Sequence, residues 1–483
     1  MKIGVYNAYW STFGGGEQQA GGVVDALSAE HQVEMLGPEA FDLGRARERL
    51  GLRLDGVTFR EVGGEQLNAT LASADYDLFI NHTYRSTAPS LAKQGIYFVM
   101  FPHRLDGTAR GDAARKVAGR FAAPVRLLGG IFHRHGRDLM VGPVQVQIAD
   151  GVQQVEIEIT ARRPEVVAMA EAHPLAPVTS HDVQGVTTLR LPAGARQVIL
   201  SPSVMADDLD LADAMCITGL RVDGRDVQAS PHSLAQRLTA VRTHDFIDTY
   251  DRFVSLSEYT RRWTHRWWGR DSTVVSPPVN LRAPGPKEQL IVSVGRFFDE
   301  ESGHSKRQLE LVEAFRTMVQ QGLEGWKLVL IGGCNPDNRE YAMAVRKAAE
   351  GLPVEVRISA PGAVVDANFA AASIYWHAAG YGSDLESNPD RAEHFGIAPI
   401  EAMSAGAVPV VFDAAGPAEV VQPGVNGLVF HTLDELVAHT RRLIDDGELR
   451  ERLAAAAVAS SQHYRRERFE DDVRALVRDV TSG

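Results

Sequence analysis

The sequence predicts an α/β protein with two doubly wound lobes and a β-rich insertion in the first lobe. Three observations support this. Residues 2–36 read as a buried strand, a glycine turn, a helix and a second strand. From residue 144, VQVQIADGVQQVEIEI alternates apolar and polar side chains. A second strand-and-helix series begins near residue 288. Strands that alternate with helices favour a parallel sheet, whereas period-two alternation is typical of half-buried antiparallel strands.

Composition excludes several classes of protein. The chain has 483 residues, 44% hydrophobic and 23% charged, which is ordinary for a soluble protein of two or three domains. A net charge of −12 argues against nucleic-acid binding. Cys216 and Cys334 lie too far apart in sequence to indicate a disulfide framework or a metal cluster. The start MKIGVYNAYW lacks the apolar core of a signal peptide, and no apolar run of membrane-spanning length follows, so we expect a cytoplasmic protein.

The first turn of the chain is rich in glycine. The expected strand KIGVYN is followed by Gly14, Gly15 and Gly16, and a helix is expected from Glu17. Glycines allow the backbone to approach a ligand closely, and a helix N-terminus favours anions. The turn does not match the dinucleotide-binding spacing. The alternative is a simple connector.

Further strands are expected at residues 57–61, 78–81 and 96–101. The second of these is followed by His82 and the third by His103. Ligands of open α/β sheets bind beyond the carboxyl ends of the strands, so both histidines are candidates for a cleft. For each, the alternative is an ordinary loop histidine.

Residues 104–138 form a basic stretch in an acidic chain, with eight Lys or Arg against three Asp, a net charge of 8 − 3 = +5. Apolar residues are interleaved with these cations. A basic amphipathic stretch of this kind indicates peripheral contact with an anionic membrane surface or an anionic acceptor. The alternative is a solvated loop and helix between two domains.

Residues 140–228 predict an inserted β-sandwich-like domain. Hairpins are expected around Pro192 to Gly194 and around Asp223 and Gly224. Asp208 and Asp210 form an Asp-x-Asp triplet within DDLDLAD, but no buried strand precedes it, so we interpret it as a solvated loop rather than a metal site. Carbohydrate recognition, assembly and simple bracing of the fold all remain open for this insertion.

Prolines divide the chain into its lobes. Pro277, Pro278, Pro284 and Pro286 indicate a stiff linker. We therefore expect a first lobe of residues 1–139 and 229–285, and a second lobe of residues 286–463. Residues 464–483 are expected to form a helix that packs back on the first lobe.

Two cations follow the first strand of the second lobe. Arg296 stands just beyond the strand QLIVSV, and Lys306 lies ten residues further on, before an expected helix. Fixed cations at a strand end and a helix start suit a diphosphate, which needs charge and several hydrogen-bond donors. Taken singly, each is more often a surface cation.

The segment EHFGIAPIEAMSAGAVP places Glu393 and Glu401 eight residues apart. Pro399 suits a first helical turn and Gly406 suits a helix end, so Glu393 is expected before a helix and Glu401 within its first two turns. Carboxylates at such a position accept hydrogen bonds from sugar hydroxyls. The alternative is two surface glutamates around a buried helix start.

Together these motifs resemble the family 4 glycosyltransferases, which are retaining enzymes of the GT-B class with two Rossmann-like lobes. The resemblance covers most of residues 288–463 and rests on GRF, IGG, IYWHAAGYG, EHFGIAPIEAMSAGAVPVV, GPAEVV and NGLVF. In the first lobe it includes GGGE, at Gly14 to Glu17, whereas residues 104–228 lie outside the common pattern.

The resemblance implies a role for each matched residue. Arg296 and Lys306 would bind the donor diphosphate and offset the charge of the leaving group. Glu393 would contact hydroxyls of the transferred sugar, and Glu401 would bind the ribose diol. The remaining implied donor contacts are the backbone of His394, Phe395, Gly396 and Ile397, and the loop with Gly15 and Gly16 that closes over the reaction centre.

The first lobe departs from the family pattern at one point. Relatives often carry a histidine immediately before a Phe-Pro pair; here Met100 stands there, and His103 follows the proline. We take His103 as the counterpart in catalysis. The resemblance implies no metal and no other cofactor.

The predicted function is transfer of a hexosyl unit from a nucleoside-diphosphate sugar to a hydroxyl group. The acceptor would be a glycan, a glycolipid or a small molecule, with polysaccharide biosynthesis as the expected setting and peripheral membrane contact through residues 104–138. Two other classes remain open, since fold does not fix function. One is another enzyme of the same fold, such as a phosphorylase, hydrolase or epimerase. The other is a non-catalytic carbohydrate-binding or assembly protein.

Overall fold

The computed structural model describes most of both lobes and the strands of the insertion. The described residues are 1–64, 66–104, 125–128, 131–134, 137–140, 144–148, 152–160, 165–170, 173–174, 179–183, 186–191, 197–201, 216–227, 245–299 and 305–482.

A seven-stranded parallel sheet forms the centre of the first lobe, in the order β19-β18-β5-β4-β1-β2-β3. The order reverses between β1 and β4, as in a doubly wound fold. The strands are β1 Lys2–Tyr6, β2 Gln32–Gly37, β3 Thr58–Glu61, β4 Leu78–Asn81, β5 Gln94–Val99, β18 Arg252–Ser255 and β19 Thr273–Val274.

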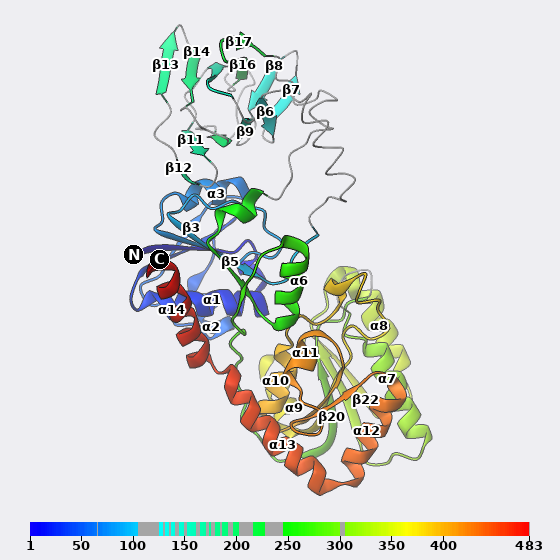
Figure 1. The fold of residues 1–483 in the computed structure, drawn as a ribbon. Helices are drawn as coiled ribbons and strands as arrows, with labels where there is room; N and C mark the ends of the chain where they lie inside the picture. Colours follow the sequence, from blue (N-terminus) through cyan, green and yellow to red (C-terminus); the bar gives the residue numbers. More distant parts are fainter. Residues whose placement is uncertain are drawn as a thin grey trace.

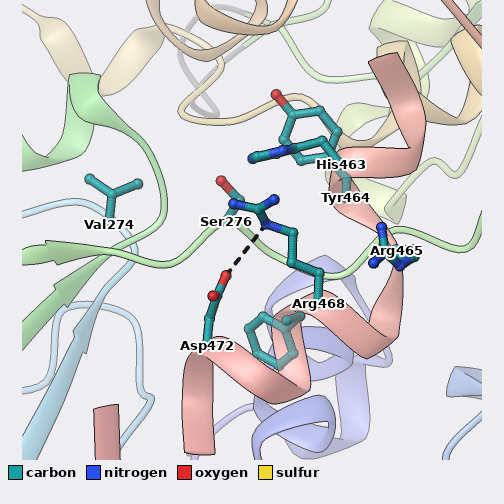
Figure 2. Close-up of a pocket in the computed structure, with 8 residues that line it drawn as sticks. Val274, Ser276, His463, Tyr464, Arg465, Arg468 and Asp472 are labelled. Carbon is teal, nitrogen blue, oxygen red and sulfur yellow. Dashed lines mark ion pairs between the residues drawn. The ribbon is translucent and has the colours of Figure 1, made fainter. Parts of the chain in front are cut away.

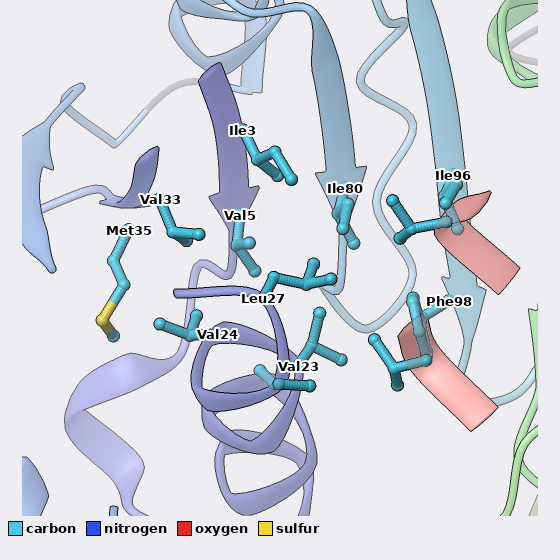
Figure 3. Close-up of a cluster of buried hydrophobic side chains, with 14 of the residues drawn as sticks. Ile3, Val5, Val23, Val24, Leu27, Val33, Met35, Ile80, Ile96 and Phe98 are labelled. Carbon is cyan, nitrogen blue, oxygen red and sulfur yellow. The ribbon is translucent and has the colours of Figure 1, made fainter. Parts of the chain in front are cut away.

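Helices cover both faces of this sheet. On one face, α1 and the C-terminal helix α14 pack over Ile3, Val5 and Ile80 (Figure 3). On the other face, Tyr6, Phe79 and Tyr97 pack in a separate aromatic cluster. The described helices of the lobe are η1 Trp10–Thr12, α1 Gly15–Ser28, α2 Leu43–Leu50, α3 Gln66–Ser73, η3 Asp245–Thr249, α6 Glu258–Trp268 and α14 Arg466–Ser482.

Two antiparallel sheets make up the insertion, and they share one apolar core with side chains from both sheets, including Val146, Ile157 and Val198. The alternation expected for residues 155–160 is present, with every second side chain buried. The strands are β6 Val125–Leu128, β7 Ile131–Arg134, β8 Arg137–Met140, β9 Val144–Ile148, β10 Val155–Thr160, β11 Glu165–Ala170, β12 His173–Pro174, β13 Thr179–Val183, β14 Val186–Arg190, β15 Gln197–Ser201, β16 Cys216–Val222 and β17 Arg225–Asp226.

The structure corrects two expectations for this insertion. Strands β6 to β8 pair with later strands, so the β region begins at Val125 and not at residue 140. The hairpin expected around Pro192 is wrong, because β14 pairs within one sheet and β15 within the other. The hairpin at Asp223 and Gly224 is confirmed by the antiparallel pairing of β16 with β17.

Two sequence predictions fall largely or wholly outside the described part of the chain. The Asp-x-Asp triplet at Asp208 and Asp210 lies outside it. Residues 105–124 of the basic stretch also lie outside the described part of the chain. The predicted membrane contact therefore stays a prediction.

The second lobe is built on a six-stranded parallel sheet in the order β22-β21-β20-β23-β24-β25, which confirms a second doubly wound lobe. Its strands are β20 Glu288–Val294, β21 Lys327–Gly332, β22 Val354–Ile358, β23 Ala372–His377, β24 Val408–Phe412 and β25 Leu428–Phe430. Its helices are α7 Gln308–Gln320, η4 Pro336–Asn338, α8 Arg339–Ala348, α9 Gly362–Ala371, η5 Pro389–Arg391, α10 Ile397–Ser404, α11 Ala415–Val420, α12 Leu433–Asp445, α13 Gly447–Ser461 and η6 Gln462–Tyr464.

The chain crosses between the lobes twice, and the two crossings lie together. The Val279 N–H donates to the Tyr464 carbonyl at 2.9 Å, and α14 then runs back along the first lobe (Figure 1). A small polar pocket lies at this crossing, where Arg468 and Asp472 are 3.8 Å apart (Figure 2). None of the described helices is both long enough and apolar enough to span a membrane.

Candidate active site

The switch point of the second lobe lies between β20 and β23, where the strand order reverses. Gly295 and Arg296 follow β20, and His377 is the last residue of β23. Ligands of doubly wound folds bind at such a point, beyond the carboxyl ends of the strands. Backbones are packed tightly here, since a Cβ added to Gly332 would lie 1.9 Å from the Gly295 carbonyl oxygen.

An ion pair between Lys306 and Glu393 lies beside this switch point. Lys306 precedes α7 and Glu393 precedes α10, and Lys306 Nζ contacts Glu393 Oε2. The two side chains are only 13% and 18% exposed. A Cβ added to Gly295 would lie 2.7 Å from Lys306 Cγ, which places this lysine against the backbone that leads to Arg296. The fold thus brings three of the predicted site residues to one place.

Arg296 differs from Lys306 in being exposed. Its guanidinium lies over the Phe298 ring, with the central carbon 4.7 Å from the ring centroid. An exposed guanidinium at the switch point presents several N–H donors to solvent and suits a phosphate ligand.

His377 is a site residue that the sequence analysis missed. Its side chain is 3% exposed, and its Nε2 lies 3.5 Å from Glu393 Oε2. Burial lowers the pKa of His377 and nearby Lys306 adds to that effect, whereas Glu393 opposes it. A polar side chain that ends a buried apolar strand, as in SIYWH, is the signal that could have identified it.

The segment before α10 joins the two lobes. The His394 ring stacks on Phe101 of the first lobe, with centroids 4.2 Å apart, and burial lowers the pKa of His394 to about 4. Gly396 has φ +100°, a conformation that favours glycine. A Cβ on Gly15 would lie 2.8 Å from Ile397 Cδ1, so a larger residue here would require the Ile397 side chain to shift. The glycine turn therefore meets the predicted donor segment directly.

Glu17 holds that glycine turn in place. Its carboxylate accepts hydrogen bonds from the Gly14 N–H at 2.8 Å and from Thr12 Oγ1 at 2.5 Å. This is a capping arrangement at the start of α1. These hydrogen bonds hold the turn at the N-terminus of α1.

Glu401 lies within α10 and is already paired with a cation. Arg282 donates to Glu401 Oε1 at 2.6 Å and also contacts Asp366. Burial raises the pKa of Glu401, while Arg282 opposes that shift. Glu401 therefore does not join the Lys306–Glu393 pair, and a ligand at this carboxylate must share it with Arg282.

The structure places the two first-lobe histidines in packed surroundings. The His103 ring stacks on Phe246 at 5.8 Å and meets Trp268 edge-on at 5.5 Å. His82 is 1% exposed and stacks on Phe98. Met100 packs with the group that contains Ile397, and its Cε lies 4.0 Å from the position of a Cβ on Gly16. Met100 thus lies near Gly16 and Ile397, at the sequence position where the resemblance implied a histidine.

Comparison with known proteins identifies the second lobe. Residues 282–459 match the profile of the family described as "Glycosyl transferases group 1". This lobe is similar to the group 1 glycosyltransferases. The matched residues also include Lys306, Glu393 and His377.

Curated relatives match part of the chain. One is "GDP-Man:Man(3)GlcNAc(2)-PP-Dol alpha-1,2-mannosyltransferase" of Dictyostelium discoideum, 25% identical over 194 residues, which are 37% of this chain and 36% of the relative. The protein of that name from Xenopus tropicalis is 28% identical over 134 residues, 27% of this chain and 25% of the relative. The matches therefore span only about a quarter to a third of these relatives' lengths.

Solved structures extend the likeness to the whole chain. HepE of Anabaena in complex with UDP has a TM-score of 0.57 at 12% identity, covering 99% of this chain and 100% of that chain. Sucrose-phosphate synthase of Thermosynechococcus elongatus has a TM-score of 0.54 at 13% identity, and the match covers 100% of this chain and 99% of that chain. This likeness shows that the two lobes together have the GT-B fold.

Proposed function

We propose that this protein transfers a glycosyl unit, a hexosyl group, from a nucleoside-diphosphate sugar to an acceptor hydroxyl. One observation carries the proposal: the Lys306–Glu393 pair lies at the switch point of a lobe that is similar to the group 1 glycosyltransferases. A cation and a carboxylate side by side suit a ligand that combines a diphosphate with sugar hydroxyls.

The donor would lie along the second lobe. Arg296 and Lys306 would bind the diphosphate, assisted by N–H groups at the start of α10, where no side chain caps the helix. Glu393 would accept hydrogen bonds from hydroxyls of the transferred sugar. Glu401 would bind the ribose diol while it keeps its contact with Arg282.

Catalysis would rest on electrostatic stabilisation and exclusion of water. As the diphosphate leaves, negative charge grows on its oxygens, and Arg296 and Lys306 would stabilise that charge. Gly15 of the first lobe lies against Ile397 of the second lobe. This contact would close the lobes over the reaction centre and protect the donor from hydrolysis. We propose retention at the anomeric carbon and no need for a divalent metal.

The acceptor would be held by the first lobe, apart from the strands of the insertion, which begin at Val125. We propose a hydroxyl of a glycan, a glycolipid or a small molecule, in polysaccharide biosynthesis at the cytoplasmic side of a membrane. GDP-mannose is the first donor to test, because the curated relatives are named for it. UDP-glucose is the second, because structures of HepE hold UDP or UDP-glucose.

A donor screen tests the proposal. The full-length protein is incubated with GDP-mannose, UDP-glucose and other nucleoside-diphosphate sugars, with and without acceptors, and mass spectrometry follows the release of nucleoside diphosphate. We expect release from one donor class, retained in EDTA and lost in Lys306→Ala. Absence of release from every donor would reject glycosyl transfer, and loss of activity in EDTA would reject the metal-independent reaction.

A further inference from the structure

The Glu393 carboxylate has a second neighbour besides Lys306. His377 Nε2 lies 3.5 Å from Glu393 Oε2, the same oxygen that Lys306 contacts. That distance is long for a hydrogen bond, but contacts in catalytic sites often tighten only when substrate binds. His377 ends β23 at the switch point, and its backbone pairs with Val411 of the neighbouring strand β24.

The other side of the imidazole faces Tyr375. The Tyr375 hydroxyl lies 3.4 Å from His377 Nδ1, and the two rings are stacked. Burial, followed by the charges of Glu393 and Glu401, raises the pKa of Tyr375 well above its usual value. The hydroxyl therefore keeps its proton, and it is able to donate a hydrogen bond to His377 Nδ1 or to the Val294 carbonyl oxygen, which lies at the same distance of 3.4 Å.

These contacts select one form of the imidazole. A neutral imidazole carries one proton, and only the form with that proton on Nε2 donates to a carboxylate. Nδ1 is then an acceptor, which matches the Tyr375 hydroxyl. The groups that face the ring are Glu393, Lys306 and Tyr375; burial and the Lys306 charge act against a second proton, and Glu393 acts in its favour.

We propose that His377, neutral and protonated on Nε2, is a positioning residue that holds the Glu393 carboxylate against Lys306 for contact with the transferred sugar. This inference rests on the proposed function, in which Glu393 binds that sugar. The Glu393 carboxylate favours the proton on Nε2, and the Tyr375 ring stacks on the imidazole. His377 acts through Glu393 and has no contact of its own with the donor in this scheme.

Nitrogen-15 spectra of the histidine side chains test the contact without any need for turnover. The His377 signal is identified by its loss in His377→Gln, among 16 histidines. We expect the pattern of a neutral ring with the proton on Nε2, and a change in Glu393→Gln. A proton on Nδ1, or no response to Glu393→Gln, would overturn the proposal.

Kinetics test the consequence for catalysis. The concentration of folded protein is measured by its binding of nucleoside diphosphate, and kcat is calculated from that concentration so that unfolded protein is excluded. Loss of a hydrogen bond to a charged group corresponds to about a ten- to a hundredfold effect, which we expect on kcat in His377→Phe with little change in the donor KM. His377→Gln keeps a side-chain N–H and should recover most of kcat. Equal kcat in His377→Phe and the parent would overturn the positioning role.

The two proposals fail in different ways. If the parent protein turns over none of the donors, the proposed function is rejected, and the spectra still decide whether His377 holds Glu393. If turnover is present and His377→Phe matches the parent, only the role of His377 is rejected.

Discussion

Ser257 of the first lobe donates from its hydroxyl to the His394 carbonyl of the second lobe, at 2.6 Å. The Ser257 hydroxyl oxygen also accepts a hydrogen bond from the Thr260 N–H and so caps helix α6. At the next two residues, the Glu419 carboxylate of the second lobe accepts from the N–H groups of Glu258 and Tyr259. The start of α6 is therefore a joint between the lobes. It is hydrogen-bonded to the segment that we propose to bind the donor.

Ser257→Ala should weaken this joint. The variant removes a helix cap, worth about 1 kcal/mol, and also the hydrogen bond to His394. We expect a larger mean separation of the lobes in small-angle X-ray scattering and a lower kcat. Thr432→Ala is the matched control, because Thr432 caps α12 within the second lobe alone. Equal scattering curves for the two variants would contradict a role in joining the lobes.

Glu393→Gln should reduce turnover by about a hundredfold. The amide keeps the shape of the side chain but lacks the charge that pairs with Lys306, which is largely buried. The measurement is kcat with the donor found in the screen. Glu355→Gln serves as the control, since Glu355 pairs with Arg357 on the same exposed strand. A Glu393→Gln variant with the kcat of Glu355→Gln would exclude a direct role for this carboxylate.

The sequence predicted the two lobes well because their patterns are local. A strand and the helix that follows it are visible in a short window, and both sheets have the strand order of doubly wound folds. The partners of β14 and β15 were not predictable in this way. The residues between them suit a tight turn, but the two strands belong to different sheets of the insertion.

For the candidate site, the sequence indicated residues, and the structure adds their contacts. Motif spacing singled out Lys306 and Glu393, which lie 87 residues apart and meet across a sheet switch point. It did not reveal that Arg282, 119 residues from Glu401, already binds that carboxylate. It also missed His377, because a single histidine after an apolar strand has no spacing partner. Contacts of this range depend on the packing of the whole lobe.

Arg296→Ala should weaken the binding of GDP or UDP by about tenfold or more, because the exposed guanidinium is assigned to the diphosphate. Little change in melting temperature is expected, since surface substitutions are usually mild. Titration calorimetry measures the affinity, with Arg339→Ala, an exposed arginine of α8, as the control. The affinity of Arg296→Lys should fall between the affinities of Arg296→Ala and Arg339→Ala, since lysine keeps the charge but lacks the planar guanidinium. Unchanged affinity in Arg296→Ala would remove this residue from the donor site.

His103→Phe distinguishes packing from chemistry at the first-lobe histidine. Because the ring packs against Phe246 and Trp268, a phenylalanine should preserve that packing, and we expect kcat within about threefold of the parent. Met100→Ala, in the gap near Gly16 and Ile397, should have the larger effect on kcat. A large loss of kcat in His103→Phe, with the melting temperature unchanged, would instead support the catalytic role implied by the resemblance.

His82 should make the protein sensitive to acid. Burial lowers the pKa of His82 to about 3, against 6.5 for an ordinary histidine. The unfolded chain therefore binds a proton below pH 6.5 that the folded protein does not, so stability is present above pH 6.5 and is lost as the pH falls toward 3. At pH 5 the loss amounts to about 2 kcal/mol.

The measurement is the fall in melting temperature between pH 7.5 and pH 5.0. His82→Phe keeps an aromatic ring against Phe98 and cannot take up a proton, so its fall should be smaller than that of the parent by a few degrees. His265→Gln, at a histidine whose side chain is 67% exposed, should behave like the parent. If His82→Phe and the parent lose the same number of degrees, His82 is not the source of the acid sensitivity, and its side chain must reach solvent or a partner in solution.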